Sequence, residues 1–362
     1  MKKTLLTAAL AAAIVVTVPV AGFYTLVKHK NGPDGQPLPN TAQVVGTADF
    51  PNLITNSGMN EFAKGSYMQQ GYNYCCVGSG NQTPAFTDTQ LQSMIAQTSN
   101  MPSDIGGANG FVATDPLNMY GYRRWVWRFP DGQAAGNIQE VGIRTYNTNP
   151  TADALMSRAL VLDVNGQPTS ITILSDETLD VFWEIRVYVP TNDVTGTITL
   201  EGIDYGYTVR AVDAGGGQYG AWWYPLATGR AQHYSSGQTL MWQDNPYSPG
   251  FAFTRNTALV AITANAVASW NIPGPDGTGW YSKDPGSTTI VTYQPGSFYL
   301  DRVLNFGLAN GNFVGGTGGS YGQALYLSTG MFGGYQIVFD KRVPKNDQKK
   351  WTQPFRVSWA RR

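Results

Sequence analysis

The stretch RRWVWRF, residues 123–129, decides the fold class, because apolar side chains and arginines alternate along it with a period of two. In an extended chain, successive side chains point to opposite faces. One face would carry Trp125, Trp127 and Phe129, and the other Arg124, Val126 and Arg128. This alternation predicts a β-strand.

A second alternating stretch, LDVFWEIRVYV at 179–189, follows the same rule. Its two faces would carry Val181, Trp183, Ile185, Val187 and Val189, and Phe182, Glu184, Arg186 and Tyr188. Further strand-like segments lie nearby: EVGIRTY (140–146), ALVLDV (159–164), TSITILSD (169–176) and TGTITLEGIDYGYTVRAV (195–212). Short strands at this spacing predict a β-sandwich over residues 116–213.

The chain as a whole has a strand-and-turn composition, and the part after residue 213 is rich in Gly, Trp and Tyr. The 362 residues include 42 glycines and 21 prolines, which favour turns, and 12% are aromatic, which favour strands. We expect a second β region of Gly-, Trp- and Tyr-rich loops and strands at 214–330. A C-terminal hairpin at 331–362 would pair YQIVF (335–339) with FRVSW (355–359). The predicted fold is mainly β, with one or two β-sandwich domains of jelly-roll type.

One or two short helices are expected near the N-terminus, in a module at 31–115. The first would be capped by Asn56 or Ser57 and run through Met59, Phe62 and Ala63. The second would lie within 83–99, where Thr87 or Asp88 is a candidate N-cap. Its apolar face would carry Leu91, Met94 and Ile95.

Residues 1–22 resemble a secretory signal, with two lysines, an apolar run from Leu5 to Val18 and a small-residue exit at 20–22. The apolar run is too short and too interrupted to predict a transmembrane helix. A retained apolar start must be buried against something. We therefore expect residues 1–30 to form an apolar arm or first strand packed in an assembly, and the alternative is a cleaved signal peptide.

Charge is balanced and sparse. Lys and Arg together number 24, as do Asp and Glu, so the chain lacks the basic excess of a nucleic-acid-binding protein. Charged residues make up 13% of the sequence, whereas about 25–35% of a free monomer's surface is usually charged. This difference favours a homo-oligomer whose surfaces are covered by neighbouring subunits.

The sequence predicts no catalytic, cofactor or metal site. Cys75 and Cys76 are adjacent, which is poor geometry for a disulfide, so we interpret them as small buried apolar residues. The only histidines are His29 and His233, too few for a His-rich metal site. Glycan cleavage would need two carboxylates, and the candidates are Asp176, Glu177, Asp180, Glu184, Asp204 and Asp244. We interpret the 176–184 group as a solvated hairpin end and expect no enzyme.

Aromatic residues in 214–330 are the candidate contacts for a receptor or a subunit interface. Exposed Trp and Tyr side chains stack on sugars and anchor interfaces. The candidates are Trp222, Trp223, Tyr224, Tyr234, Trp242, Tyr247, Trp280 and Tyr281. The competing interpretation is that these rings fill a β-domain core or pack between subunits.

Three segments resemble tail-associated structural proteins of tailed bacteriophages. They are FPNLITNSGMNEFA with CCVGSGNQTPAFTDTQL (within 50–98), RRWVWRFPDGQAAGNIQEVGI with SRALVLDVNGQPTSITILSDETLDVFWEIRVYVPTNDVTGTITLEG (within 120–205), and GGYQIVFDKRVPKNDQKKWTQPFRVSWARR (within 330–362). The resemblance implies a fibre, baseplate or collar component of the virion tail, made in the host cytoplasm, that assembles with other virion proteins and contributes to host attachment. The alternatives are a secreted or outer-membrane bacterial β protein and a module that binds a host surface glycan.

Overall fold

The fold is mainly β, as the alternating stretches predict. The computed structural model describes residues 4–7, 14–63, 74–112, 119–144, 155–190, 192–211, 230–231, 240–241, 261–263, 281–282, 287–290, 293–308, 324–328, 334–341 and 348–362. Within these residues the regular elements are one α-helix, one short 3-10 helix (Pro39–Thr41) and strands, joined by turns and loops. None of the helices described is long and apolar enough to cross a membrane.

The chain divides into two compact units. Unit 1 comprises Met1–Pro19, Phe111–Gly121 and Val187–Ala360, and unit 2 comprises Val20–Gly110, Tyr122–Arg186 and Arg361–Arg362. The segment 116–213, expected as one sandwich, therefore contributes strands to both units. Each passage from one unit to the other falls inside a strand, for example within β2 (Ile14–Lys30) and β12 (Glu177–Tyr188). The units are thus not joined by loop linkers at these passages.

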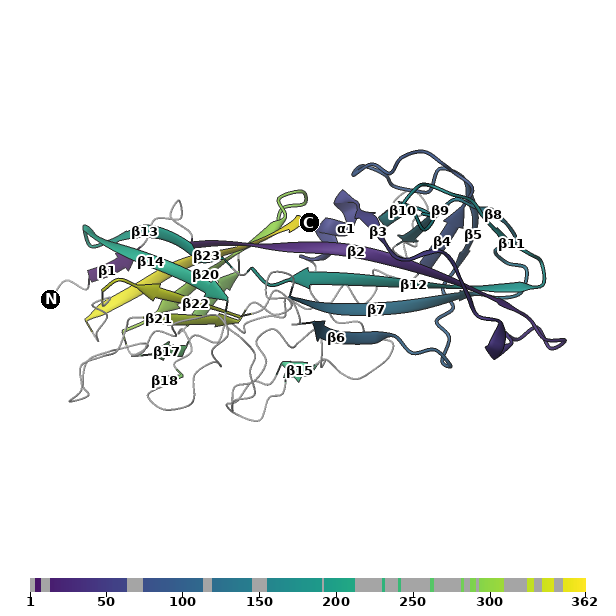
Figure 1. The fold of residues 1–362 in the computed structure, drawn as a ribbon. Coiled ribbons are helices and arrows are strands. Elements are labelled where there is room, and N and C mark those ends of the chain that lie inside the picture. The colour runs from purple at the N-terminus through teal and green to yellow at the C-terminus, as the bar shows by residue number, and fades with distance from the viewer. Residues whose placement is uncertain are drawn as a thin grey trace. The chain divides into compact units, whose positions relative to one another are not determined.

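Unit 2 is built on a sheet in which β2 has neighbours on both sides, as Figure 1 shows. On one side the strand order is β3–β10–β9–β4–β5, and on the other β12 pairs with β2 and β7, with β6 beyond β7. The strands and helix are β3 (Gln43–Ile54), α1 (Asn56–Glu61), β4 (Tyr74–Gly78), β5 (Met94–Thr98), β6 (Ala108–Val112), β7 (Tyr120–Phe129), β8 (Gly136–Ile138), β9 (Glu140–Arg144), β10 (Leu155–Leu160) and β11 (Ile171–Ile173).

The expected faces of β7 and β12 form the core of unit 2. The indole rings of Trp125 and Trp183 stack with centroids 5.2 Å apart, and Trp127 is fully buried beside them. The opposite face of β7 is also covered, because Val126 and Arg128 are buried. Both faces of β7 are therefore packed at these positions.

Unit 1 contains strands of two large sheets and one separate strand pair. One has the order β13–β14–β22–β21–β17–β18, and the other places β23 between β20 and β2, with β19 beyond β20 and β1 on β23. The strands are β1 (Thr4–Thr7), β13 (Val194–Leu200), β14 (Ile203–Ala211), β17 (Ala261–Thr263), β18 (Tyr281–Ser282), β19 (Ser287–Ile290), β20 (Tyr299–Phe306), β21 (Ala324–Ser328), β22 (Gly334–Phe339) and β23 (Lys349–Arg361), and a separate pair, β15 (Arg230–Ala231) and β16 (Leu240–Met241).

The expected hairpin between 335–339 and 355–359 does not form. β22 pairs with β14 and β21, whereas β23 pairs with β20. The two strands instead meet through rings: Tyr335 lies 6.1 Å from Phe355, and Phe339 lies 5.9 Å from Trp351, between ring centroids. These strands pack face to face in different sheets because their buried aromatic positions face each other.

The helix predictions are half right. The first helix exists as α1, but its N-cap is Thr55, whose hydroxyl accepts a hydrogen bond from the backbone N–H of Gly58, and not Asn56 or Ser57. The prediction of a second helix within 83–99 is wrong. That segment is an irregular loop followed by β5, in which Met94 and Ile95 are exposed.

Candidate functional site

The aromatic candidates lie mostly outside the described residues. This applies to Trp222, Trp223, Tyr224, Tyr234, Trp242, Tyr247 and Trp280, and also to His233 and Asp244. Tyr281 lies in the short strand β18, where its partner in the ladder is Ile262. The described residues that could form a functional site therefore lie elsewhere in the chain.

The carboxylates between 176 and 184 do not form a solvated hairpin end. Asp176 is exposed in a turn, as expected, but Glu177, Asp180 and Glu184 are only 3%, 0% and 4% exposed. That interpretation was wrong for these three because strand alternation cannot distinguish a solvated face from one covered by cations. Each of the three faces a cationic side chain on another strand.

Asp180 is held by Arg128 and His29. The guanidinium of Arg128 donates to both carboxylate oxygens of Asp180, at 2.8 and 2.9 Å, and His29 Nε2 lies 3.0 Å from Oδ2. Arg128 Nη1 also donates to Asp104, at 3.0 and 2.9 Å. The hydrogen bonds to Asp180 outweigh burial and raise the pKa of Arg128. Both oxygens of Asp180 are thus committed to this network.

The other two buried carboxylates are also paired. Glu184 Oε2 lies 2.8 Å from Arg124 Nη2, and Glu184 Oε1 lies 2.6 Å from Arg186 Nε. Glu177 Oε1 lies 3.1 Å from Lys28 Nζ. A glycoside hydrolase needs a protonated acid and a second carboxylate open to the sugar. The carboxylates of this group are engaged with cations instead, and they tie β2, β7 and β12 together.

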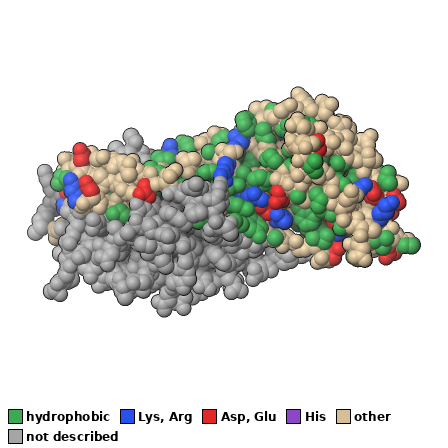
Figure 2. All heavy atoms as spheres, viewed as in Figure 1, with side chains coloured by type: hydrophobic (Ala, Val, Ile, Leu, Met, Phe, Trp, Pro, Cys, Tyr) green, Lys and Arg blue, Asp and Glu red, His purple; other side chains and the backbone are tan. Residues whose placement is uncertain are grey.

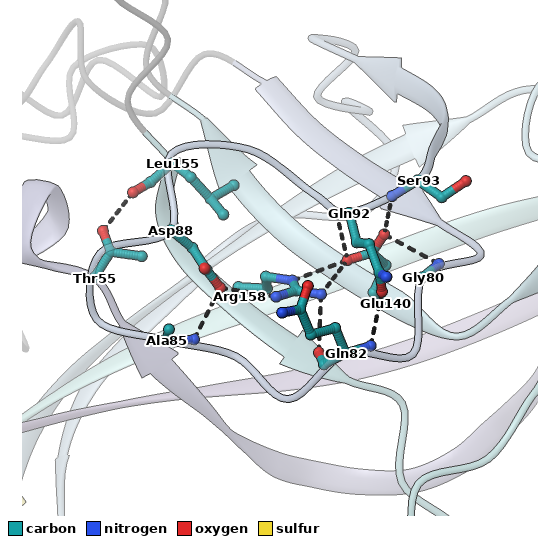
Figure 3. Close-up of polar contacts among 10 residues, drawn as sticks. All are labelled: Thr55, Gly80, Gln82, Ala85, Asp88, Gln92, Ser93, Glu140, Leu155 and Arg158. Atoms are coloured by element: carbon teal, nitrogen blue, oxygen red, sulfur yellow. Dashed lines mark hydrogen bonds and ion pairs between the residues drawn. The ribbon is translucent and has the colours of Figure 1, made fainter.

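A second buried ionic network organises the long loop that replaces the expected helix, and Figure 3 shows it in close-up. At its centre is Glu140, the first residue of β9, which is 0% exposed. Its carboxylate accepts hydrogen bonds from the backbone N–H groups of Gly80, Gln92 and Ser93, at 3.1, 3.1 and 2.7 Å. These N–H groups would serve other acceptors in a helix, so Glu140 fixes a non-helical path.

Arg158 on β10 neutralises Glu140. Its Nε and Nη2 lie 2.9 and 2.8 Å from Glu140 Oε2, and the arginine is 2% exposed. The same guanidinium donates to the carbonyl of Gln82 and to Asp88, at 3.0 and 2.8 Å. A fully buried guanidinium with all these acceptors fastens the loop at several points along its length.

The tip of the loop is a tight turn around Phe86. The N–H of Ala85 donates to the carboxylate of Asp88, and the N–H of Asp88 donates to the carbonyl of Ala85. Asp88, expected as a helix cap, thus closes a turn. The carbonyl of Phe86 accepts from the N–H of Asn56, at 2.8 Å.

Arg361 supports the ring of Phe86 from one side. Its guanidinium carbon lies 4.2 Å from the ring centroid. Its nitrogens donate to the carbonyl of Ile54 at 2.5 Å and to Asn56 Oδ1 at 2.8 Å. Phe86 is nevertheless 51% exposed. An exposed aromatic ring is therefore held in a fixed position.

The sequence interpretation missed Phe86, Glu140 and Arg158. A signal exists for the last two, since QEVGI and SRALVL each place one charge in an otherwise apolar strand. Charged residues in buried strands are usually paired. The pairing partner, however, cannot be chosen from the pattern alone.

The cysteines match their expected role. Cys75 and Cys76 are not joined by a disulfide, and both side chains are fully buried in β4. Burial raises the pKa of the Cys75 thiol well above its usual value, which disfavours the nucleophilic thiolate. Within the part of the chain that the structure describes, no group of three or more His, Cys, Asp or Glu residues is placed to hold a metal ion.

Comparison with known proteins finds no relative of this chain. No protein-family model matches the chain, and no curated protein or solved structure matches it either.

Proposed function

We propose that this chain is a structural component of a bacteriophage tail, in its fibre, baseplate or collar, and that it assembles with copies of itself and with other virion proteins. The proposal rests on the resemblance of three segments to tail-associated proteins and on one structural observation. That observation is the place of the signal-like segment in the fold.

The signal-like segment supplies a core strand of unit 1. Every second residue of β2 from Ile14 to Val20 is buried, with Ile14, Val16 and Val18 at 0%, 2% and 0% exposure. The intervening Val15 and Thr17 face outward. Such alternation belongs to a half-buried strand, and the β-branched residues of the segment favour that conformation.

This strand lies next to the C-terminal strand. β2 neighbours β23 in the sheet, and the hydroxyl of Thr17 lies 2.7 Å from that of Ser358. β1 also pairs with β23, in parallel. Cleavage after Ala21 would remove β1 and the first part of β2, and β23 would lose the strands that pair with it there. We therefore expect the fold of unit 1 to depend on the segment. This requirement favours a virion protein over a secreted one.

The resembling segments also meet at one place. The Asn-Leu-Ile-Thr stretch ends β3 and caps α1 at Thr55, whose hydroxyl donates to the carbonyl of Leu155. The Val-Gly-Ser-Gly-Asn turn begins the loop held by Glu140 and Arg158. A set of segments that builds one network supports a shared structural role.

Mass spectrometry of purified phage particles tests the proposal. The chain should be present, with an N-terminal peptide that begins at Met1 or Lys2, and gold-labelled antibodies should mark the tail. A chain absent from the particles contradicts the tail assignment. A chain that begins near Gly22 and is found in the culture medium or outer membrane supports the bacterial alternative.

A further inference from the structure

Phe86 has an exposed ring on a turn that several parts of the chain hold in place. The ring is 51% exposed, yet contacts from four parts of the chain hold its turn. They are the N–H of Asn56 at the start of α1, the guanidinium of Arg158 on β10 acting through Asp88, the guanidinium of Arg361 at the end of β23, and the turn's own Ala85–Asp88 hydrogen bonds. Burying an ion pair costs desolvation free energy, and the role best attested for such pairs is to specify one conformation.

The segment that carries Phe86 has little charge of its own, and Arg361 covers one side of the ring. From Ser79 to Ser103 the only charged residue is Asp88, and Arg158 neutralises it. The exposed side chains of 81–90, apart from Ala85 and Phe86, carry hydroxyl or amide groups: Asn81, Gln82, Thr83, Thr87, Thr89 and Gln90. In the view of Figure 2, the part of unit 2 with β4, β5, β9 and β10 shows few charged atoms.

We propose that the segment 81–90 binds a neutral carbohydrate, with Phe86 as the stacking platform and the neighbouring hydroxyl and amide side chains as hydrogen-bond partners. A sugar ring presents an apolar C–H face and a rim of hydroxyl groups. An aromatic ring with one open face matches the first, and Thr and Gln side chains, which both donate and accept, match the second. Because the turn is already ordered, binding loses little conformational entropy.

The same observations disfavour other ligand classes. A phosphate or a nucleic acid would need free cations, but Arg158 is buried and Arg361 lies against the ring, donating to Ile54 and Asn56. The core of a protein interface is enriched in several apolar and aromatic side chains, whereas this turn exposes a single large one. The inference does not depend on the tail assignment.

Saturation-transfer NMR and titration calorimetry with the full chain test this site. The probes are four neutral oligosaccharides: malto-, manno-, galacto- and N-acetylglucosamine tetramers. At least one should bind, and Phe86→Ala should weaken it by about tenfold or more, which is a typical loss for a stacking residue. The double variant Thr87→Ala/Thr89→Ala should weaken oligosaccharide binding too, but by a smaller factor than Phe86→Ala.

The matched control is Leu38→Ala, because Leu38 is 43% exposed on another turn of unit 2 and should not affect binding. All variants should keep the wild-type circular dichroism spectrum and melting temperature, since the substituted side chains are exposed. Failure of all four probes to bind overturns the proposal. So does binding that Phe86→Ala leaves unchanged, because the sugar then sits elsewhere.

Discussion

Glu140 and Arg158 form a buried diagonal pair across the antiparallel strands β9 and β10, with Glu140 Oε2 2.9 Å from Arg158 Nε. Glu140 stands opposite Leu160 in the ladder, two residues along from Arg158, so both side chains lie on one face of the sheet. Both side chains also contact the loop at 79–93, and these contacts fix its conformation. The conformation of Phe86 therefore depends on residues more than fifty positions away in the sequence.

Removing one partner should be far more costly than removing both. Glu140→Gln leaves the buried Arg158 guanidinium with Asp88, at the loop, as its remaining carboxylate partner. The variant should lower the free energy of unfolding by about 3–5 kcal/mol. Arg158→Met should have a similar effect. The double variant should cost clearly less than the sum, which urea denaturation of all four proteins would measure. Strict additivity would mean that the two side chains do not interact in the folded protein.

Strand alternation predicted β7 and β12 and the faces they bury. The same rule failed at Glu184, because a polar residue that alternates with core residues looks solvated in the sequence. Its burial depends on Arg124 and Arg186. The positions were therefore predictable, but the ionic layer covering the second face was not.

The loop at 79–93 shows a different limit. Leu91, Met94 and Ile95 have helical spacing, and Asp88 is a good cap, so local signals favour a helix. The carboxylate of Glu140 captures the N–H groups of Gln92 and Ser93 from 48 and 47 residues away. A distant acceptor, Glu140, thus overrides the local helix propensity. A single sequence does not reveal such a distant contact.

The strand formed by the signal-like segment should be essential to stability. Ile14→Ala removes a fully buried side chain and should lower the free energy of unfolding by about 2–5 kcal/mol. Val15→Ala is the matched control, because Val15 is 38% exposed on the other face and its loss should cost no more than about 0.5 kcal/mol. Equal effects in chemical denaturation would contradict the alternating burial of β2.

Asp104 should contribute a pH-dependent increment of stability. Burial opposes ionisation of Asp104, but hydrogen bonds from Arg128 outweigh it and lower the pKa of the carboxyl below its usual value. The stabilisation is therefore present above the unfolded-state pKa of about 3.9 and is lost as the pH falls through the lower folded-state pKa.

The variant Asp104→Asn isolates this contribution. Since the Asp104 side chain is 61% exposed, the difference from wild type in unfolding free energy should be only about 0.2–1 kcal/mol at pH 7. The difference should shrink as the pH falls below about 3.9, because the unfolded-state carboxyl then takes up a proton before the folded-state carboxyl does. A difference that stays constant between pH 7 and pH 3 would mean that the Asp104 charge is not what Arg128 recognises.

Gly58 should tolerate no side chain, because α1 packs directly on the backbone of β10. A Cβ atom at this position would lie 2.1 Å from the carbonyl oxygen of Met156 and 2.9 Å from Cγ2 of Ile54. The backbone oxygen cannot rotate away, so Gly58→Ala should push α1 off β10 and lower the free energy of unfolding by about 1–3 kcal/mol or more. Ser57→Ala, in the same helical turn but only half-buried, is the control and should change stability little. Thermal denaturation followed by circular dichroism would compare the two, and a Gly58→Ala protein as stable as wild type would show that α1 does not pack this closely.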